Sequence, residues 1–239
     1  MITFDRVSKR YPNGREALTD VSFSIEAGEM AFLTGRSGAG KSSVLKLIAL
    51  LERPSRGVVT VNQTSTSTLS SRRIPAFRRQ IGVVFQDHKL LMDRPVFDNV
   101  ALPLVVADTP LREIDKRVRA ALDQVGLLGK ERVLPSELSV GEQQRVGIAR
   151  AVISKPPVLI ADEPTGNLDR DLALDVMRLF QRFQEVGVTV LIATHDMQLV
   201  HEFGRRELVL DNGRLKAAQE PAVPTLAPAG TAAAAPPSL

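Results

Sequence analysis

The chain contains the stretch Gly35-Arg36-Ser37-Gly38-Ala39-Gly40-Lys41-Ser42. Glycine lets a backbone turn tightly and approach an anion closely, so we expect the N–H groups of residues 37–42 to surround a β-phosphate. Lys41 adds a positive charge that can span the β- and γ-phosphates, and the Ser42 hydroxyl can coordinate a Mg²⁺ ion that bridges them. The stretch therefore predicts a phosphate-binding loop.

Both flanks of this loop support that interpretation. The apolar residues 30–34 predict a short buried strand before it. An apolar helix after it is predicted by Val44, Leu45, Leu47, Ile48 and Leu51. The positive end of that helix would face the phosphates.

An acidic pair, Asp162-Glu163, follows the apolar stretch 158–161. If that stretch is a strand of an open parallel sheet, the pair stands at the carboxyl end, where such sheets bind ligands. Phosphoryl transfer needs cations that neutralise oxygen charge and one group that orients or deprotonates the attacking water. We therefore assign Asp162 to the metal shell and Glu163 to the water as general base. Loop and acidic pair together predict a nucleotide hydrolase.

Ser139-Val140-Gly141-Glu142 has the serine-to-glutamate spacing of a capping box, which predicts the start of a helix. A capped helix start is also a potential anion site. Taken alone, the box indicates only a structural cap. Its position before the strand that ends at Asp162 favours a functional role.

The composition is that of an ordinary globular protein, with 239 residues, 44% of them hydrophobic and 24% charged. Its apolar stretches are shorter than the roughly 18 to 20 residues of a membrane-spanning helix. The amino terminus lacks the pattern of a secretory signal and the chain has no cysteine, so we expect a cytoplasmic location.

The formal net charge of +4 is modest. We interpret the arginine clusters at 72–73 and 78–79 as a solvated face rather than a nucleic-acid site, since the 4% aromatic content offers few platforms for base stacking. Attraction to an anionic membrane leaflet would suit the same charges equally well.

Strands and helices are predicted in three parts of the chain. The stretches 21–25, 57–61 and 81–85 predict strands around the phosphate loop. From about 87 to 155 helical spacing dominates, carried by Ile114, Val118, Leu122 and Val125 and then by residues 146–153. Strands return at 158–161 and 188–193, with a helix predicted over 171–185.

The carboxyl-terminal part begins with Asn212-Gly213, which predicts a tight hairpin turn between two short strands. Residues 217–239 are almost entirely alanine, proline and small polar residues, and we predict that this tail is disordered.

These features, together with Gln86, the Gly166–Asp169 segment and His195, resemble the ATP-binding subunit of ABC transporters over residues 1 to about 216. The resemblance implies an α/β fold: a P-loop NTPase (RecA-like) core, an amino-terminal antiparallel β subdomain and a helical signature-motif subdomain at about 87–155. It also implies hydrolysis of ATP to ADP and phosphate, with ATP and Mg²⁺ bound.

Further residue roles are implied only by this resemblance. Tyr11 would stack on adenine, Gln86 would join the metal to a transmembrane partner, and His195 would contact the γ-phosphate. The implied catalytic residues are Glu163, His195, Lys41 and Gln86; the metal ligands are Ser42, Gln86 and Asp162; the nucleotide-binding residues are Tyr11, Gly35, Arg36, Ser37, Gly38, Ala39, Gly40, Lys41, Ser42, Ser43, Ser139, Gly141 and Asp169. His88 and His201 are interpreted as structural or surface residues.

The resemblance also implies a homodimer that forms on ATP binding. Ser139 and Gly141 of one copy would lie against the ATP held by the other, and Asp169 would help to communicate across the interface. Val140 stands where the family usually has glycine, so we expect an ordinary backbone conformation there. Ser43, where threonine is commoner, is a milder departure.

The segments 32–42, 85–94 and 143–151 are similar to the cell-division branch of this family. That branch implies a peripheral protein at the cytoplasmic face of the bacterial inner membrane, which drives an FtsX-like integral membrane protein that controls septal cell-wall hydrolases. The family docks its membrane subunit after Gln86, through Asn99. Other cytoplasmic division proteins are further candidate partners, and no nucleic acid is expected.

Two alternatives stay open from the sequence. One is the ATPase of a lipoprotein-release or macrolide-export transporter, whose relatives share the Gly166–Asp169 segment, although residues 87–94 argue against it. The other is a soluble ATP switch that acts on ribosomes or DNA. Such relatives carry two cassettes or long inserted arms, and neither is seen in this sequence.

Overall fold

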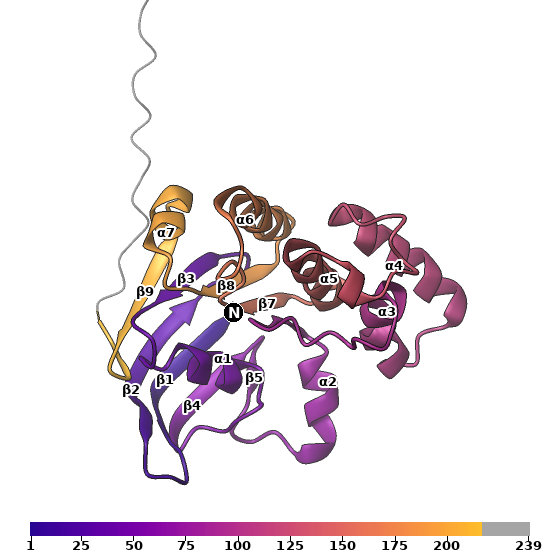
Figure 1. The fold of residues 1–239 in the computed structure, drawn as a ribbon. Coiled ribbons are helices and arrows are strands. Elements are labelled where there is room, and N and C mark those ends of the chain that lie inside the picture. Colours follow the sequence, from indigo (N-terminus) through magenta and orange to yellow (C-terminus); the bar gives the residue numbers. More distant parts are fainter. Residues whose placement is uncertain (217–239) are drawn as a thin grey trace, which may run out of the picture.

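The computed structural model describes residues 1–216, and the predicted disordered tail lies outside them (Figure 1). Two sheets and the helices around them make up the fold. The strands are β1 (Ile2–Arg10), β2 (Glu16–Ile25), β3 (Met30–Thr34), β4 (Arg56–Val61), β5 (Thr64–Ser65), β6 (Ile81–Val84), β7 (Val158–Asp162), β8 (Thr189–Ala193), β9 (Arg206–Asp211) and β10 (Arg214–Leu215). The α-helices are α1 (Lys41–Ile48), α2 (Ile74–Arg78), α3 (Val96–Val106), α4 (Leu111–Gln124), α5 (Val140–Val152), α6 (Arg170–Glu185) and α7 (Met197–Phe203).

The first sheet is antiparallel, with strand order β2-β1-β4-β5. It confirms the expected amino-terminal β subdomain, and β2 and β4 contain the stretches predicted as strands. Phe4 of β1 and Phe23 of β2 stack with ring centroids 4.5 Å apart on its buried face. β1 is not among the predicted strands, because a bulge at Arg6, where φ is 46°, interrupts its alternating pattern.

The second sheet has the order β10-β9-β3-β8-β7-β6, and its strands from β9 to β6 run parallel. Its central strands β3 and β8 are buried throughout, which explains why they read as unbroken apolar runs. β8 lies between β3 and β7. This order brings the carboxyl ends of β3 and β7, after which the phosphate loop and Glu163 follow, to one edge.

The faces of this parallel sheet are covered differently. α1 and the antiparallel sheet pack on one face, whereas α5 and α6 pack on the other (Figure 1). α1 is shorter than predicted: it ends at Ile48, because Leu50 adopts a left-handed φ of 51°. Leu51, which we expected within the apolar helix, lies beyond it with 49% of its surface exposed.

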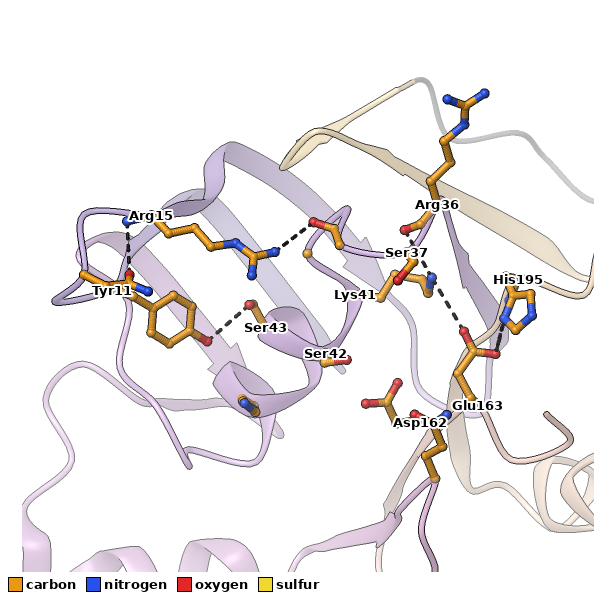
Figure 2. A pocket seen from close by; sticks show the side chains of 15 residues that line it. Tyr11, Arg15, Arg36, Ser37, Lys41, Ser42, Ser43, Asp162, Glu163 and His195 are labelled. Carbon is orange, nitrogen blue, oxygen red and sulfur yellow. Dashed lines mark hydrogen bonds and ion pairs between the residues drawn. The ribbon is translucent and has the colours of Figure 1, made fainter. Parts of the chain in front are cut away.

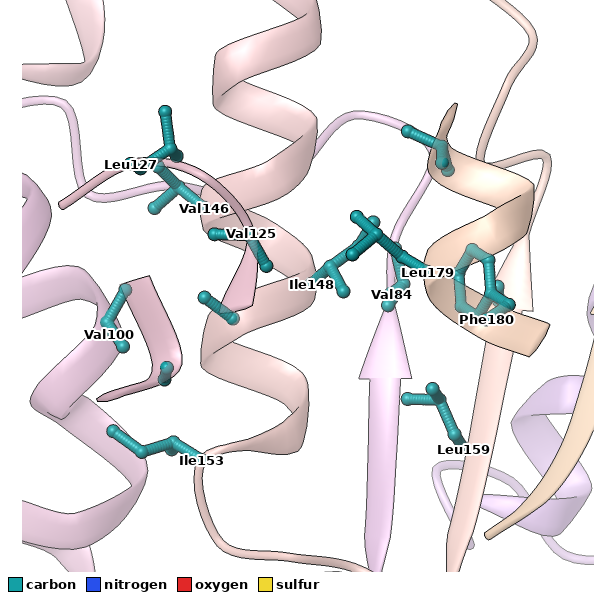
Figure 3. Packing of buried hydrophobic residues seen from close by; sticks show 14 of the residues in the cluster. Val84, Val100, Val125, Leu127, Val146, Ile148, Ile153, Leu159, Leu179 and Phe180 are labelled. Carbon is teal, nitrogen blue, oxygen red and sulfur yellow. The ribbon is translucent and has the colours of Figure 1, made fainter. Parts of the chain in front are cut away.

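The helices α3, α4 and α5 form a layer beside β6, and their side chains join the core that α6 covers (Figure 3). Val100, Ile148 and Phe180 are fully buried in this core. The periodic residues 114–124 fall on α4 and 146–152 fall on α5, as predicted, whereas Val125 and Ile153 are the capping residues just after these helices. The predicted helical region does not begin at residue 87, because residues 87–95 are irregular and α3 starts at Val96.

Asn99 holds the irregular segment before α3 in place. Its fully buried side chain accepts a hydrogen bond from the N–H of Leu91 at 2.7 Å and donates to the carbonyls of Leu91, Arg94 and Pro95. Within residues 1–216, no helix combines the length and the apolar character that crossing a membrane requires.

Phe180→Ala should lower the free energy of unfolding by about 3–5 kcal/mol, because it removes a fully buried ring and leaves a cavity under α6. Leu111→Ala is the control: this side chain is 83% exposed, and its loss should change stability by no more than about 0.5 kcal/mol. Urea unfolding of both variants measures the difference. Equal losses would show that the core is not centred where α6 meets the sheet.

Candidate nucleotide site

The phosphate loop lies between β3 and α1. Neighbouring backbone atoms leave no room for a side chain at two of its glycines. Gly35 has a φ of 142°, and a Cβ there would lie 2.2 Å from the carbonyl oxygen of Leu210. Gly40 has a φ of 114°, and a Cβ would lie 2.6 Å from the carbonyl oxygen of Ala17. Both distances are too short for any side chain, so the loop can pack against its neighbours only with glycine at these positions.

A cavity of about 750 Å³ opens over this loop (Figure 2). Most of the residues predicted for the site line it, namely Tyr11, Arg36, Ser37, Gly38, Gly40, Lys41, Ser42, Ser43, Gln86, Asp162, Glu163 and His195. Gly35 and Ala39 belong to the same loop without lining the cavity. Asn13, Arg15 and Lys46 also line it and were not singled out in the sequence. Only Arg15 shows an anchoring contact to the loop, a 3.3 Å hydrogen bond to the carbonyl of Gly38.

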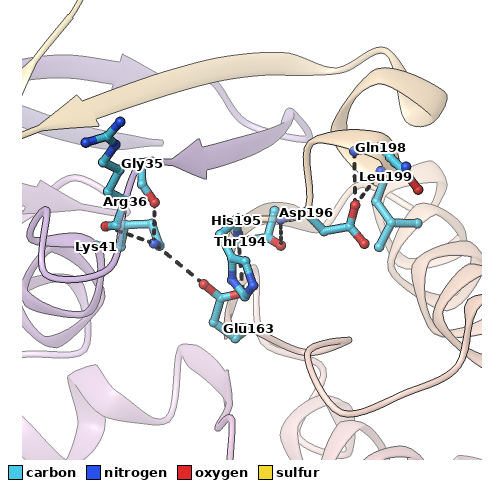
Figure 4. A network of polar contacts seen from close by, with 9 residues as sticks. All are labelled: Gly35, Arg36, Lys41, Glu163, Thr194, His195, Asp196, Gln198 and Leu199. Carbon is cyan, nitrogen blue, oxygen red and sulfur yellow. Dashed lines mark hydrogen bonds and ion pairs between the residues drawn. The ribbon is translucent and has the colours of Figure 1, made fainter.

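Lys41 is buried at the floor of this cavity. Its ammonium donates to the carbonyl of Gly35 at 2.7 Å and lies 3.6 Å from Oε1 of Glu163 (Figure 4). The positive charge therefore stands between the loop and the acidic pair. An anion held by the loop would meet it directly.

Glu163 directly follows β7, and contacts hold both its backbone N–H and its carboxylate. Its φ of 47° is uncommon for a residue with a side chain. Its N–H donates to the carbonyl of Ala193 at 2.9 Å, which ties it to β8. Its Oε2 lies 2.8 Å from Nδ1 of His195 and accepts from the N–H of the same residue at 3.3 Å. The carboxylate is thus fixed between Lys41 and His195.

His195 lies in the bend between β8 and α7. The next residue, Asp196, caps α7 by accepting from the N–H groups of Gln198 and Leu199 at 3.0 and 3.1 Å (Figure 4). The N–H of Asp196 itself donates to the hydroxyl of Thr194. These bonds fix the bend, and the imidazole projects from it with 68% of its surface exposed.

Asp162, the last residue of β7, lines the cavity together with Ser42 and Gln86, and it is hydrogen-bonded to the Ser42 hydroxyl. Burial raises the pKa of the Asp162 carboxyl, and the Ser42 hydroxyl and Lys41 offset part of this effect. Carboxylate, hydroxyl and amide oxygens suit Mg²⁺, which usually takes only one or two protein carboxylates and completes its shell with phosphates and water. Among the described residues, no cluster of three His, Cys, Asp or Glu side chains is able to hold a metal ion.

Tyr11 stands at the mouth of the cavity. Its hydroxyl lies 3.2 Å from Oγ of Ser43, and the ammonium of Lys9 lies 4.9 Å from the ring centroid. Lys9 is itself held by a 2.8 Å ion pair with Glu52. The ring is therefore anchored at its edge and, through the cation, at its face.

Ser139, Gly141 and Asp169 are not brought to this cavity. Ser139 and Glu142 form the predicted capping box at the start of α5, with hydrogen bonds of 3.3 and 3.0 Å. Hydrogen bonds from Lys130 and Ser139 hold the pKa of Glu142 below its usual value. Asp169 caps α6 in the same way, by accepting from the N–H of Leu172.

Val140 belongs to the signature segment, Ser139-Val140-Gly141, and adopts an ordinary helical conformation there. Val140 is the first residue of α5, it has no positive φ, and 46% of its side chain is exposed. Gly141 is the residue under steric constraint, since a Cβ there would lie 3.0 Å from Cδ1 of Leu172.

Asp162→Asn should raise the free energy of unfolding at neutral pH. Because the folded pKa is raised above 3.8, the stabilising contribution of Asp162 is complete below pH 3.8 and is lost as the pH rises through the folded pKa. Asparagine stays neutral, so its advantage should shrink as the pH falls toward 3.8. Urea unfolding of the variant and of the parent, from neutral pH down to pH 3.8, measures this difference in stability.

The control is Asp115→Asn, an exposed carboxylate paired with Arg119 on α4. This variant should lose a little stability at neutral pH, if it changes at all. An Asp162→Asn protein that is less stable than the parent at neutral pH would contradict the raised pKa of Asp162 in the folded protein.

Comparisons with known proteins show the family to which the chain belongs. Residues 18–166 match the family model described as ABC transporter. The chain is 57% identical over 215 residues to the cell division ATP-binding protein FtsE of Escherichia coli (strain K12). The aligned residues cover 90% of this chain and 97% of that protein. It is 45% identical over 213 residues to FtsE of Bacillus subtilis, covering 89% and 93%.

Solved structures resemble it as well. The ATP-binding cassette MJ0796, in a dimeric post-hydrolysis state bound to ADP and Pi, superposes with a TM-score of 0.86 at 33% identity, covering 93% of this chain and 100% of that one. CbiO1 from Clostridium perfringens, part of the transporter complex cbiONQ, gives a TM-score of 0.84 at 31% identity, covering 92% and 88%. This chain therefore belongs to the ABC transporter family, as an ATP-binding and ATP-hydrolysing subunit.

Proposed function

We propose that Glu163 is the general base of ATP hydrolysis. The observation that carries this assignment is its position: a carboxylate fixed between Lys41 and His195 at the mouth of the phosphate loop. A base must be held within hydrogen-bond reach of the water that it deprotonates, and this carboxylate has little freedom to leave.

The other residues of the cavity would bind and orient the triphosphate. N–H groups of the loop surround the β-phosphate, and Lys41 spans the β- and γ-phosphates. Mg²⁺, held by Ser42, Asp162 and Gln86, would neutralise charge on the phosphate oxygens. Tyr11 would stack on the adenine. Arg15, anchored to Gly38, adds a positive charge beside the same phosphates.

His195 would connect the base to the γ-phosphate. Its Nδ1 faces Glu163 at 2.8 Å, which leaves Nε2 for the phosphate. Glu163 would accept the proton of the attacking water while His195 holds oxygens of the γ-phosphate, and ADP would leave as the bond to the γ-phosphorus breaks.

We further propose that the active unit is a homodimer. Ser139 and Gly141 lie outside the cavity of their own chain, although a capped helix start is a suitable place for an anion. In a head-to-tail dimer each α5 would complete the site of the other copy, with Asp169 at the interface. The dimeric state of MJ0796 bound to ADP and Pi supports this assembly. Residues 1–216 would form the ATPase domain, and about 87–155 would be its helical subdomain, whose first helix starts at Val96.

The membrane partner is proposed to be an FtsX-like integral membrane protein, reached from the cytoplasmic face of the inner membrane. The relatives, which are named cell division ATP-binding protein FtsE, support a role in cell division. So does a group of exposed apolar side chains within residues 91–106, just after Gln86: Leu91, Met92, Leu102, Val105 and Val106. The output would be control of septal cell-wall hydrolases.

Glu163→Gln should keep ATP binding and lower hydrolysis at least roughly a hundredfold, because a glutamine cannot accept the proton of water. The closed dimer should then persist with ATP and appear in gel filtration. Lys41→Ala is the contrasting variant and should lose nucleotide affinity instead. A Glu163→Gln protein with full turnover would remove Glu163 as the base.

Affinity purification of the full chain from membranes of its native host tests the partner. We expect a membrane protein of the FtsX type, and ATP hydrolysis in the complex that requires Glu163. Recovery of a lipoprotein-release or macrolide-export permease would keep the chemistry and replace the biology. Recovery of ribosomal proteins or DNA-bound fractions would replace both the partner and the membrane location.

A further inference from the structure

The segment that carries Gln86 is a strained turn. The N–H of His88 donates to the carbonyl of Phe85 at 3.1 Å, so Gln86 and Asp87 are the central residues of this turn. His88 and Lys89, which follow, have φ values of 54° and 47°. Two successive left-handed residues other than glycine are unfavourable by themselves, so a contact from outside the turn must hold them.

Arg150 supplies that contact from the last turns of α5. Its Nη1 donates to the carbonyl of Lys89 at 2.7 Å and its Nη2 to the carbonyl of His88 at 2.5 Å. The planar guanidinium fork suits two neighbouring carbonyls in a way that a single ammonium does not. Gly147, one helical turn earlier, lies close to the same turn: a Cβ there would be 3.9 Å from the His88 oxygen.

The two partners of Arg150 are neutral backbone groups. Burial lowers the pKa of the Arg150 guanidinium, which nonetheless stays charged because its ordinary pKa is so high. Removing a charged group from water is unfavourable, and charge-assisted bonds to the carbonyls offset this cost. The contact therefore strongly favours one position of the turn relative to α5.

The same helix begins at Val140, directly after its capping residue Ser139, and Gly141 is its second residue. One rigid element thus connects the segment proposed to touch the ATP of a second copy with the turn that presents Gln86 to the metal. We propose that Arg150 is a positioning residue that couples α5 to the Gln86 turn, so that the placement of Gln86 follows the placement of the signature segment. This inference rests on the proposed role of Gln86 as a metal ligand.

The test is a double-mutant cycle between Arg150→Gln and Gln86→Ala in the full-length chain bound to its membrane partner. ATP hydrolysis is titrated with Mg²⁺ in each variant. Glutamine is neutral and has one short amide, so it cannot reach both carbonyls. Arg150→Gln alone should raise the Mg²⁺ concentration for half-maximal activity roughly tenfold and change ATP affinity less than about twofold. In the Gln86→Ala background it should have less than about a twofold further effect.

The possible outcomes separate the two proposals. If Gln86→Ala leaves the Mg²⁺ dependence unchanged, the proposed role of Gln86 fails and the coupling fails with it. If Gln86→Ala changes that dependence but the effects of the two substitutions add independently, the coupling alone is overturned, because Arg150 would then act on general stability.

Two matched controls and a structural readout complete the design. Arg117→Gln removes an exposed arginine that is paired with Glu113 on α4, and Gly147→Ala adds a methyl group beside the His88 carbonyl at ordinary contact distance. Both should stay within about twofold of the parent.

Hydrogen exchange of the isolated chain should be roughly tenfold faster over residues 86–90 in Arg150→Gln and unchanged over 158–163. Unchanged exchange over 86–90 would overturn the inference even without an activity measurement. If Arg150→Gln does not fold, Arg150→Lys serves in the same cycle with a smaller expected shift, because it keeps the charge and loses the fork.

Discussion

The site depends on the backbone pairing around β8, the strand between the phosphate loop and the acidic pair. Pairing continues past the strand ends, where the N–H of Glu163 donates to the carbonyl of Ala193 and the N–H of Thr194 donates to that of Leu33. These two bonds place the segments of Lys41, Glu163 and His195 in one register. A slip by one residue would turn each side chain to the opposite face. The relative positions of Lys41, Glu163 and His195 therefore depend on the register of the sheet.

Much of this arrangement could be predicted because it is encoded locally. Buried parallel strands read as apolar runs, amphipathic helices show their spacing, and the Asn212-Gly213 turn, with φ values of 48° and 76°, needs residues that tolerate that conformation. The capping box at Ser139 was likewise readable, since all its members lie within one turn of helix.

What escaped prediction depends on distant contacts or on broken patterns. A bulge interrupts the alternation of β1, Pro103 lies inside α3, and α7 is only 7 residues long. Arg15 approaches the loop from a turn between β1 and β2, and Arg150 meets residues that lie far away in the sequence. The roles of Tyr11, Gln86 and His195 came from family resemblance, because nothing in their own neighbourhoods marks them.

The order of the strands also has a consequence for synthesis on the ribosome. Lys41 lies near the beginning of the described chain and His195 near its end, and the strand that joins their segments, β8, is made late. Contacts between such distant residues form slowly and only after most of the chain is available. A nascent chain would expose the apolar β3 and the phosphate loop for most of translation without a finished cavity. The chain would thus become able to bind nucleotide only after β8 has been made and has paired with β3 and β7.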